Sequence, residues 1–182
     1  MDNKNNLNTA LISTPTLKVL DFLLQHPEVE LNDTEIAGQL DTVRKSAVNL
    51  ALRALAGLGL VKRVPRGRMV FNSLVESPLV LQLKTTSNLV RLAPLIEQMK
   101  PLCLKIILFG SRAEGTHRSE SDFDLLAIVD DDEAVRGVVR KSILAERIQL
   151  LMKKPEQALT IDKDEPVLSR QVKKGIVLWQ RE

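Results

Sequence analysis

The sequence predicts an α+β fold in two parts: three helices plus a β-hairpin come first, and a small mixed α/β part follows. Apolar residues recur at helical spacing in three early segments, and two short apolar runs then flank Pro65-Arg66-Gly67. Later, an apolar run ends in Gly110-Ser111, and another begins at Asp122 and Asp124. A chain of 182 residues can hold two small domains.

The first two helices are marked by their start and stop residues. Thr14 before Pro15 is a favourable helix start, and the apolar stripe that follows stops at Pro27. Asn32 or Asp33 is expected to cap a short second helix.

The third helix is expected to open at Asp41 or Thr42 and to end near Gly57-Leu58-Gly59. A hairpin should follow, with Pro65-Arg66-Gly67 at its basic tip. The inner residues expected for the third helix are Val48, Leu52 and Leu55.

Charge is segregated within this first part. Met1–Asp41 carries seven acidic residues against two lysines, whereas Thr42–Val75 carries seven basic residues and no acid. Such asymmetry indicates a directed positive surface.

This order of helix, short helix, helix and basic hairpin resembles a winged helix-turn-helix domain. The sequence itself is similar to such domains at Asn32–Ala37 and Ala54–Val61. We assign residues 12–77 to it, after a flexible N-terminus at 1–11. The resemblance implies double-stranded DNA as a partner, although some such domains bind protein and basic faces are often only solvated. The expected DNA-binding residues are Thr42, Arg44, Lys45, Ser46, Asn49, Arg66 and Arg68.

The join between the parts is expected at residues 78–87, where Ser77-Pro78 and Thr85-Thr86-Ser87 indicate a linker. An apolar stripe at helical spacing follows from Asn88 to Lys100. The second domain is therefore expected at residues 88–182.

Two carboxylates define the candidate site. Asp122 and Asp124 are two apart at the start of a strand, so their side chains share a face. Paired carboxylates suit Mg²⁺, which also takes ligands from substrate phosphates. The amides of the Gly110-Ser111 turn suit a phosphate.

The segment from Gly110 to Asp124 resembles the signature of minimal nucleotidyltransferases of the DNA polymerase beta superfamily. The resemblance implies a catalytic, metal-binding role for Asp122 and Asp124 with Mg²⁺ or Mn²⁺. It also implies a nucleoside triphosphate, ATP by resemblance, held by four nucleotide-binding residues: Gly110, Ser111, Arg112 and Ser121. His117 and Arg118, in the intervening loop, are expected to be exposed.

The sequence departs from this family's pattern at the third carboxylate, which the family normally supplies. The tail resembles the family in its strand at Ile148–Met152, its helix opening at Pro155-Glu156 and its closing strand at Gly175–Trp179. In that register Gln149 stands at the acidic position, and an amide can coordinate but cannot take a proton. Asp162 could substitute only in another register.

A capped helix is expected between the two carboxylates and this tail. Asp130 to Glu133 should cap it, and its apolar stripe should run from Val135 through Ile143 and Leu144.

These features predict a DNA-binding nucleotidyltransferase that transfers a nucleotidyl group, AMP by resemblance, to an acceptor hydroxyl. The acceptor could be a toxin-antitoxin partner such as a HEPN-class toxin, or a small molecule. The alternatives are a transcription regulator whose nucleotide-binding domain is catalytically impaired, and a pure protein-interaction module. A homodimer would suit the palindromic operators that winged helices often bind.

Composition adds constraints. Aromatic residues are 3% of the chain and tyrosine is absent, which argues against stacking on single-stranded nucleic acid and excludes self-modification on tyrosine. The single cysteine, Cys103, fits a reducing compartment, and no signal-peptide or membrane-span pattern is present. A cytoplasmic location without membrane contact is therefore expected.

Overall fold

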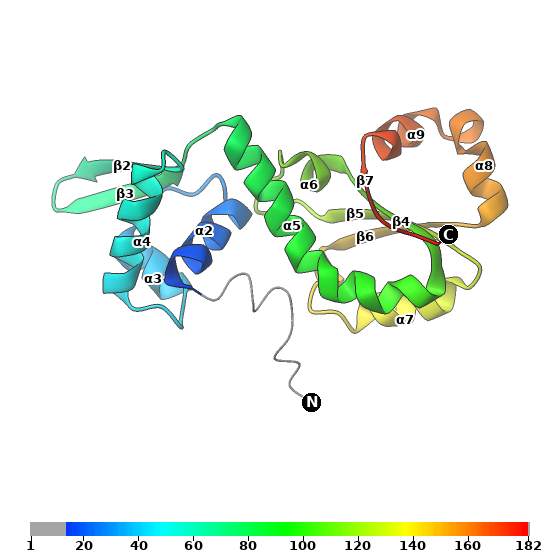
Figure 1. Cartoon of the computed structure of the whole chain (residues 1–182), viewed down its shortest axis with the longest axis horizontal. Helices are drawn as coiled ribbons and strands as arrows, with labels where there is room; N and C mark the ends of the chain where they lie inside the picture. Colours follow the sequence, from blue (N-terminus) through cyan, green and yellow to red (C-terminus); the bar gives the residue numbers. More distant parts are fainter. Residues whose placement is uncertain (1–13, 182) are drawn as a thin grey trace. The chain divides into compact units, whose positions relative to one another are not determined.

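The computed structural model describes residues 14–181. The chain divides into two compact units, Met1–Ser87 and Asn88–Glu182, with the boundary inside one long helix (Figure 1). The flexible terminus predicted at residues 1–11 lies outside the described residues.

The three predicted helices of the first unit are present as α2 (Pro15–Gln25), α3 (Asp33–Gln39) and α4 (Lys45–Gly57). The Thr14 side chain accepts a hydrogen bond from the amide of Leu17, and so caps α2. Asn32 forms a reciprocal capping box at α3. These two helix starts are local, which is why the sequence indicates them.

The predicted start of α4 at Asp41 or Thr42 is wrong. The helix begins at Lys45, with Arg44 at the N-cap position and no side-chain cap bond. Thr42 instead accepts a hydrogen bond from Lys18 at 3.0 Å, which ties it to α2. The predicted inner residues of α4 are confirmed as buried: Val48, Leu52 and Leu55.

The predicted hairpin is present as β2 (Val61–Arg66) and β3 (Met69–Leu74). The short strand β1 (Leu31–Asn32), which the sequence analysis missed, adds antiparallel to β3, giving the order β1-β3-β2. The predicted tip is corrected, because Arg66 pairs with Met69 and the turn is Gly67-Arg68. Gly67 has φ +61°, as the first position of a type II′ turn requires.

Residues 78–87 are helical, so the predicted linker is not a loop. They form the first turns of α5 (Pro78–Met99) and belong to the first unit, where Val80 is buried in its core. Thr85 and Thr86 remain compatible with the helix because their hydroxyls donate to carbonyls four residues earlier.

The second unit is built on a four-stranded mixed sheet in the order β6-β5-β4-β7. β4 runs antiparallel to β5 and β7, whereas β6 runs parallel to β5. The strands are β4 (Cys103–Phe109), β5 (Phe123–Val129), β6 (Ile148–Lys153) and β7 (Ile176–Gln180).

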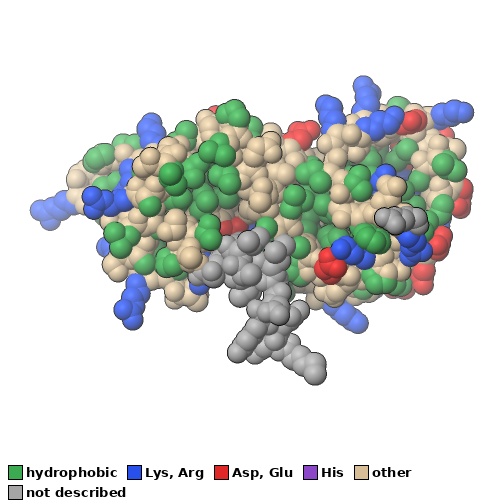
Figure 2. Space-filling view, in the orientation of Figure 1, with side chains coloured by type: hydrophobic (Ala, Val, Ile, Leu, Met, Phe, Trp, Pro, Cys, Tyr) green, Lys and Arg blue, Asp and Glu red, His purple; other side chains and the backbone are tan. Residues whose placement is uncertain are grey.

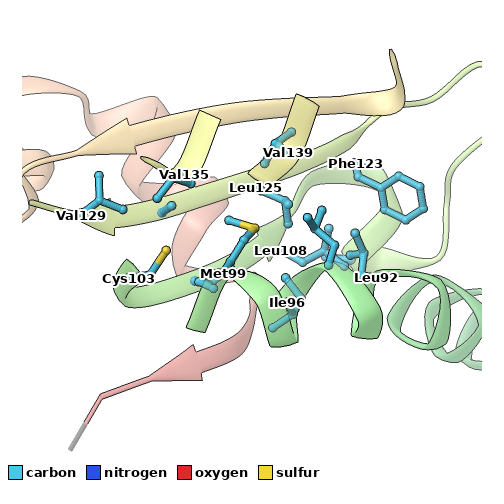
Figure 3. Close-up of a cluster of buried hydrophobic side chains, with 14 residues drawn as sticks. Leu92, Ile96, Met99, Cys103, Leu108, Phe123, Leu125, Val129, Val135 and Val139 are labelled. Atoms are coloured by element: carbon cyan, nitrogen blue, oxygen red, sulfur yellow. The ribbon is translucent and has the colours of Figure 1, made fainter. Parts of the chain in front are cut away.

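Each face of this sheet carries its own hydrophobic cluster. Figure 3 shows the larger one, where Leu92, Ile96 and Met99 of α5 pack on Leu108 and Leu125. The opposite face holds a smaller cluster of Ile107, Phe109 and Leu126 beneath two C-terminal helices (Figure 1). These helices are α8 (Pro155–Asp164) and α9 (Pro166–Lys173).

The remaining helices of the second unit are short. They are α6 (Gly110–Glu114), α7 (Asp132–Arg140) and the 3-10 turns η1 (Lys100–Leu102) and η2 (Ala145–Arg147). Asp131 caps α7, as predicted, but the helix ends at Arg140. Ile143 lies beyond it, 98% exposed, which corrects the predicted stripe. None of the described helices is long and apolar enough to span a membrane.

Candidate functional site

The site lies where β4 gives way to α6, beside the first residues of β5. Phe109, the last residue of β4, is in register with Asp124 on the antiparallel neighbour. Asp124 lies on the sheet face of Leu126, because side chains alternate along the strand. Asp122 immediately precedes β5 and is exposed. The sheet therefore places both carboxylates beside the Gly110-Ser111 segment.

Two features of the structure, a backbone angle and a close contact, require glycine at position 110. Its φ is +71°, which L side chains rarely adopt. A Cβ at this position would lie 3.2 Å from Cγ of Asp124 and would collide with its Oδ2. The backbone of this turn therefore packs directly against a carboxylate. The short α6 then closes at Gly115, also with positive φ, and the amide of Thr116 donates to the carbonyl of Ser111 at 2.9 Å.

The ionised form of Asp124 is disfavoured by its surroundings. Burial first, and then the negative charge of Asp122, raise the pKa of Asp124 above its ordinary value. A divalent cation between the two groups would relieve both effects. Asp122 and Asp124 thus form a donor set that suits Mg²⁺.

Gln149 occupies the lateral position predicted from its register. It pairs with Asp124 across the parallel β5–β6 ladder, so the amide and the carboxylate share a sheet face. Asp162 is elsewhere, on α8, paired with Lys173 at 2.7 Å and with the Ser169 hydroxyl. Within residues 14–181 no three His, Cys, Asp or Glu side chains come together as a metal-binding group. The donor set in this part of the chain is therefore two acids and an amide neighbour.

Arg112 is buried and has a positioning geometry. Its Nε and Nη2 donate to the carbonyl of Ser121 at 3.0 and 2.8 Å, and its Nη1 donates to Asn88 at 3.0 Å. The guanidinium also stacks 4.2 Å from the centre of the Phe123 ring. Burial, then the charges of Arg147 and Arg91, lower the pKa of Arg112 to about 10, so it remains cationic at neutral pH. Arg112 therefore holds the loop that leads into Asp122.

Ser121 and its neighbours also form hydrogen bonds within the loop that leads into Asp122. The Ser121 hydroxyl accepts a hydrogen bond from the amide of Arg118 at 3.0 Å, while its carbonyl receives Arg112. The expectation that His117 is exposed is wrong. The residue is 1% exposed, and its Nδ1 lies 3.2 Å from the side-chain nitrogen Nδ2 of Asn88. Arg118 is exposed, as predicted.

A cavity of about 320 Å³ opens beside the Gly110-Ser111 turn. Its far wall comes from the end of α9, about sixty residues away in sequence, and sequence reasoning missed these residues. Their only sequence signal is a concentration of basic residues after Pro166. The lining residues are Gly110, Ser111, Glu114, Thr116, Arg170, Gln171 and Lys174.

In the first unit, Lys45, Asn49 and Arg68 line one cavity of about 600 Å³ between α3, α4 and β3. Asn49 is engaged there, because its amide donates to Asp33. Asp33 also accepts two hydrogen bonds from Arg63, at 3.1 and 3.2 Å, and one from Asn72. These partly buried contacts join α3, α4 and the hairpin, and no local sequence pattern indicates them.

The remaining basic residues predicted to bind DNA are spread along the unit. Arg66 pairs with Glu30 at 2.8 Å and lies 5.1 Å from the centre of the Phe71 ring. Ser46 is exposed in the first turn of α4, whereas Arg44 precedes the helix.

Comparison with known proteins agrees with this arrangement. Residues 95–182 match the family described as Polymerase beta, Nucleotidyltransferase. The matched segment contains both carboxylates, the Gly110-Ser111 turn, Gln149 and the cavity wall of α9.

One solved structure, titled "Crystal structure of the toxin-antitoxin with AMP-PNP", is 25% identical and has a TM-score of 0.37. The alignment covers 52% of this chain and 75% of that chain. No curated protein matches the chain.

Proposed function

We propose that the nucleotidyltransferase domain binds a nucleoside triphosphate with Mg²⁺ or Mn²⁺ and transfers its nucleotidyl group, AMP from ATP, to an acceptor hydroxyl. The observation that carries this proposal is the close packing of the Asp124 carboxylate against the backbone of Gly110, with Asp122 beside it. Two carboxylates next to a side-chain-free turn suit a metal-bound phosphate chain.

Asp122 and Asp124 would hold the cation, which when bound neutralises charge that develops on the phosphates. Ser111 and the neighbouring amides would bind phosphate oxygens. The acceptor oxygen forms a bond to the α-phosphorus as the bond to the β-phosphate oxygen breaks. Pyrophosphate leaves, and the hydroxyl proton passes to water. Arg112 and Ser121 would support this site by holding the loop before Asp122.

The alternative is a transcription regulator whose nucleotide-binding domain turns over poorly. The specific observation in its favour is the register of Gln149 with Asp124, since an amide at this point neither neutralises a cation nor accepts a proton.

Labelled ATP with Mg²⁺ separates the two candidates. If the protein is an enzyme, it should bind ATP in a Mg²⁺-dependent way and transfer the label to an acceptor. Both properties should be lost in Asp122→Asn and in Asp124→Asn. Asp130→Asn is the matched control, because Asp130 follows the other end of β5. Binding without transfer, even with proteins of neighbouring genes present, favours the regulator. Absence of Mg²⁺-dependent binding overturns both.

We further propose that the first unit is a winged helix-turn-helix that binds double-stranded DNA through the start of α4 and the hairpin. The order of three helices and a hairpin supports this, as do the exposed Lys45, Ser46 and Arg68. Figure 2 shows Lys and Arg side chains at the hairpin end of this unit. A homodimer would match a palindromic operator.

Fluorescence anisotropy with a DNA duplex tests this proposal. Arg68→Ala combined with Lys45→Ala should weaken binding. It should also reduce the slope of log affinity against log salt concentration by about two, one for each charge removed. Lys62→Ala is the control, because it removes a basic residue of β2 that does not line the cavity between α3, α4 and β3. Salt-independent or undetectable binding would contradict DNA recognition and leave a protein partner as the role of this unit.

For the acceptor, we propose a protein, such as a HEPN-class toxin, as the resemblance implies. Incubating wild-type protein, labelled ATP and candidate neighbours should label the partner on a hydroxyl residue. Labelling of small molecules alone would contradict a protein acceptor.

A further inference from the structure

We propose that Arg170 and Lys174 of the α9 end form the binding wall for the outer phosphates of the nucleotide, so that the site selects triphosphates over monophosphates. This inference rests on the proposed nucleotide binding and assigns residues that the glycine-serine signature does not contain.

The chemistry of the cavity favours a phosphate chain. Its volume of about 320 Å³ is at the small end of ligand pockets, which span about 300–1,000 Å³. Every lining residue is polar or glycine, so the wall contains no aliphatic or aromatic side chain of the kind that usually packs on a base. Two hydroxyl residues, Ser111 and Thr116, and two cationic residues, Arg170 and Lys174, line the same cavity, and their side chains are hydrogen-bond donors that match phosphate oxygens.

The two cations are placed for joint action. Arg170 and Lys174 are four apart at the end of α9, so they lie on the same side of the helix. Among the described residues, the Lys174 ammonium has no ion-pair partner, and Arg170 donates only through Nε, to the carbonyl of Pro166 at 3.2 Å. The terminal guanidinium nitrogens of Arg170 thus remain available for an anion.

The third basic residue of this segment is used differently. Lys173 pairs with Asp162 on α8 at 2.7 Å and does not line the cavity. Figure 2 shows the resulting concentration of Lys and Arg side chains over α9. The single acid in the lining is the exposed Glu114, so the wall keeps a net positive charge.

The cavity also adjoins the carboxylate pair through one residue. Gly110 lines the cavity and packs against Asp124. A phosphate chain bound at the cation between Asp122 and Asp124 would therefore extend past Gly110, with its outer phosphates beside Arg170 and Lys174.

Calorimetric titration of the full chain with ATP and AMP, in Mg²⁺, tests the proposal. Wild type should bind ATP more tightly than AMP. Arg170→Ala and Lys174→Ala should each weaken ATP binding about tenfold, since a charge-assisted hydrogen bond contributes about that factor. AMP binding should stay unchanged. Lys173→Ala is the matched control and should leave ATP binding within twofold, with thermal melts confirming that all variants fold.

The outcomes separate the two proposals. Wild type that binds Mg²⁺-ATP, with both α9 variants unaffected, overturns this inference and leaves the proposed function standing. An equal loss for ATP and AMP, or the same loss in Lys173→Ala, also overturns it, because the effect would then be general attraction. Wild type that binds no Mg²⁺-ATP refutes the proposed function, and this inference with it.

Discussion

At the scale of single residues, Gly110 is the position where backbone geometry and chemistry meet. Its positive φ and its contact with Asp124 are separate constraints, and any side chain violates both. The backbone of Asp124 is held in the β4–β5 ladder opposite Phe109, so its carboxylate could make room for a Cβ only by rotating away from the turn. A substitution here should therefore damage the site before it damages the fold.

Gly110→Ala should abolish Mg²⁺-ATP binding in calorimetry, because the added methyl occupies the space of the Asp124 carboxylate. A backbone cost of about 1 kcal/mol for the positive φ should also appear as a lower denaturation midpoint. Gly137→Ala is the control, since a Cβ there meets nothing within 4 Å and the residue lies inside α7. That variant should be unchanged or more stable by about 0.4–1 kcal/mol. Unchanged ATP binding in Gly110→Ala would contradict the site.

Gln149 offers the complementary test, by addition of charge. Gln149→Glu would place a third carboxylate laterally beside Asp124. Without metal, like charges should destabilise the fold by about 0.2–1 kcal/mol, while affinity for Mn²⁺ should rise about tenfold or more. Chemical denaturation and metal titration measure the two effects. Gln180→Glu on β7 is the control. Equal metal affinity in wild type and Gln149→Glu would show that the amide is not beside the cation.

At the scale of elements, the loop between α6 and β5 is held by side chains rather than by regular structure. Arg112 and Arg147 both donate to the carbonyl of Ser121, and Arg147 also donates to that of Ser119. Asn88 of α5 completes the arrangement by bonding both the side chain and the carbonyl of Arg112. The position of Asp122 depends on these contacts, because it directly follows Ser121.

Arg112→Lys should keep the positive charge but lose the paired donation to Ser121, since a lysine ammonium lacks the planar fork of separate nitrogens that a guanidinium presents. We expect a loss of about 1.5–3 kcal/mol in unfolding free energy and faster tryptic cleavage at Arg118. Arg136→Lys, on the exposed side of α7, should stay within about 0.5 kcal/mol of wild type. Equal stability of Arg112→Lys and wild type would show that the loop does not depend on this guanidinium.

The helices also show where local sequence signals predict the structure and where they fail. The Thr14 and Asn32 caps lie within a few residues of the amides they bind, so the sequence reveals them. The linker predicted from Thr85-Thr86-Ser87 is helix instead, and the buried Ser87 hydroxyl accepts a hydrogen bond from Gln25 and donates one to Asp21. Those partners lie more than sixty residues away, outside the reach of any local pattern.

At the scale of the whole molecule, each unit has its own hydrophobic core. Leu52 is fully buried in the core of the first unit, and Leu108 is fully buried in that of the second. Nucleotide binding and DNA binding are thus proposed for parts with separate sources of stability.

Leu52→Ala should destabilise the first unit by about 2–5 kcal/mol, while Mg²⁺-ATP affinity stays within twofold. Leu108→Ala should reverse the pattern, with ATP binding lost as the second unit unfolds. Denaturant titrations followed by circular dichroism and by ATP binding separate the effects. A single transition that both variants shift equally would instead indicate one cooperative unit.

The sequence by itself determined the strand, turn and strand that carry Gly110, Asp122 and Asp124, because alternation and turn chemistry act over a few residues. It also placed Gln149 beside the carboxylate pair, and the register of Gln149 with Asp124 confirms that position. Only the tertiary structure decided that Arg112 is buried under the loop and that the end of α9 meets the glycine-serine turn. Those contacts join residues far apart in the chain, and they depend on which sheet face each helix covers, which local spacing does not encode.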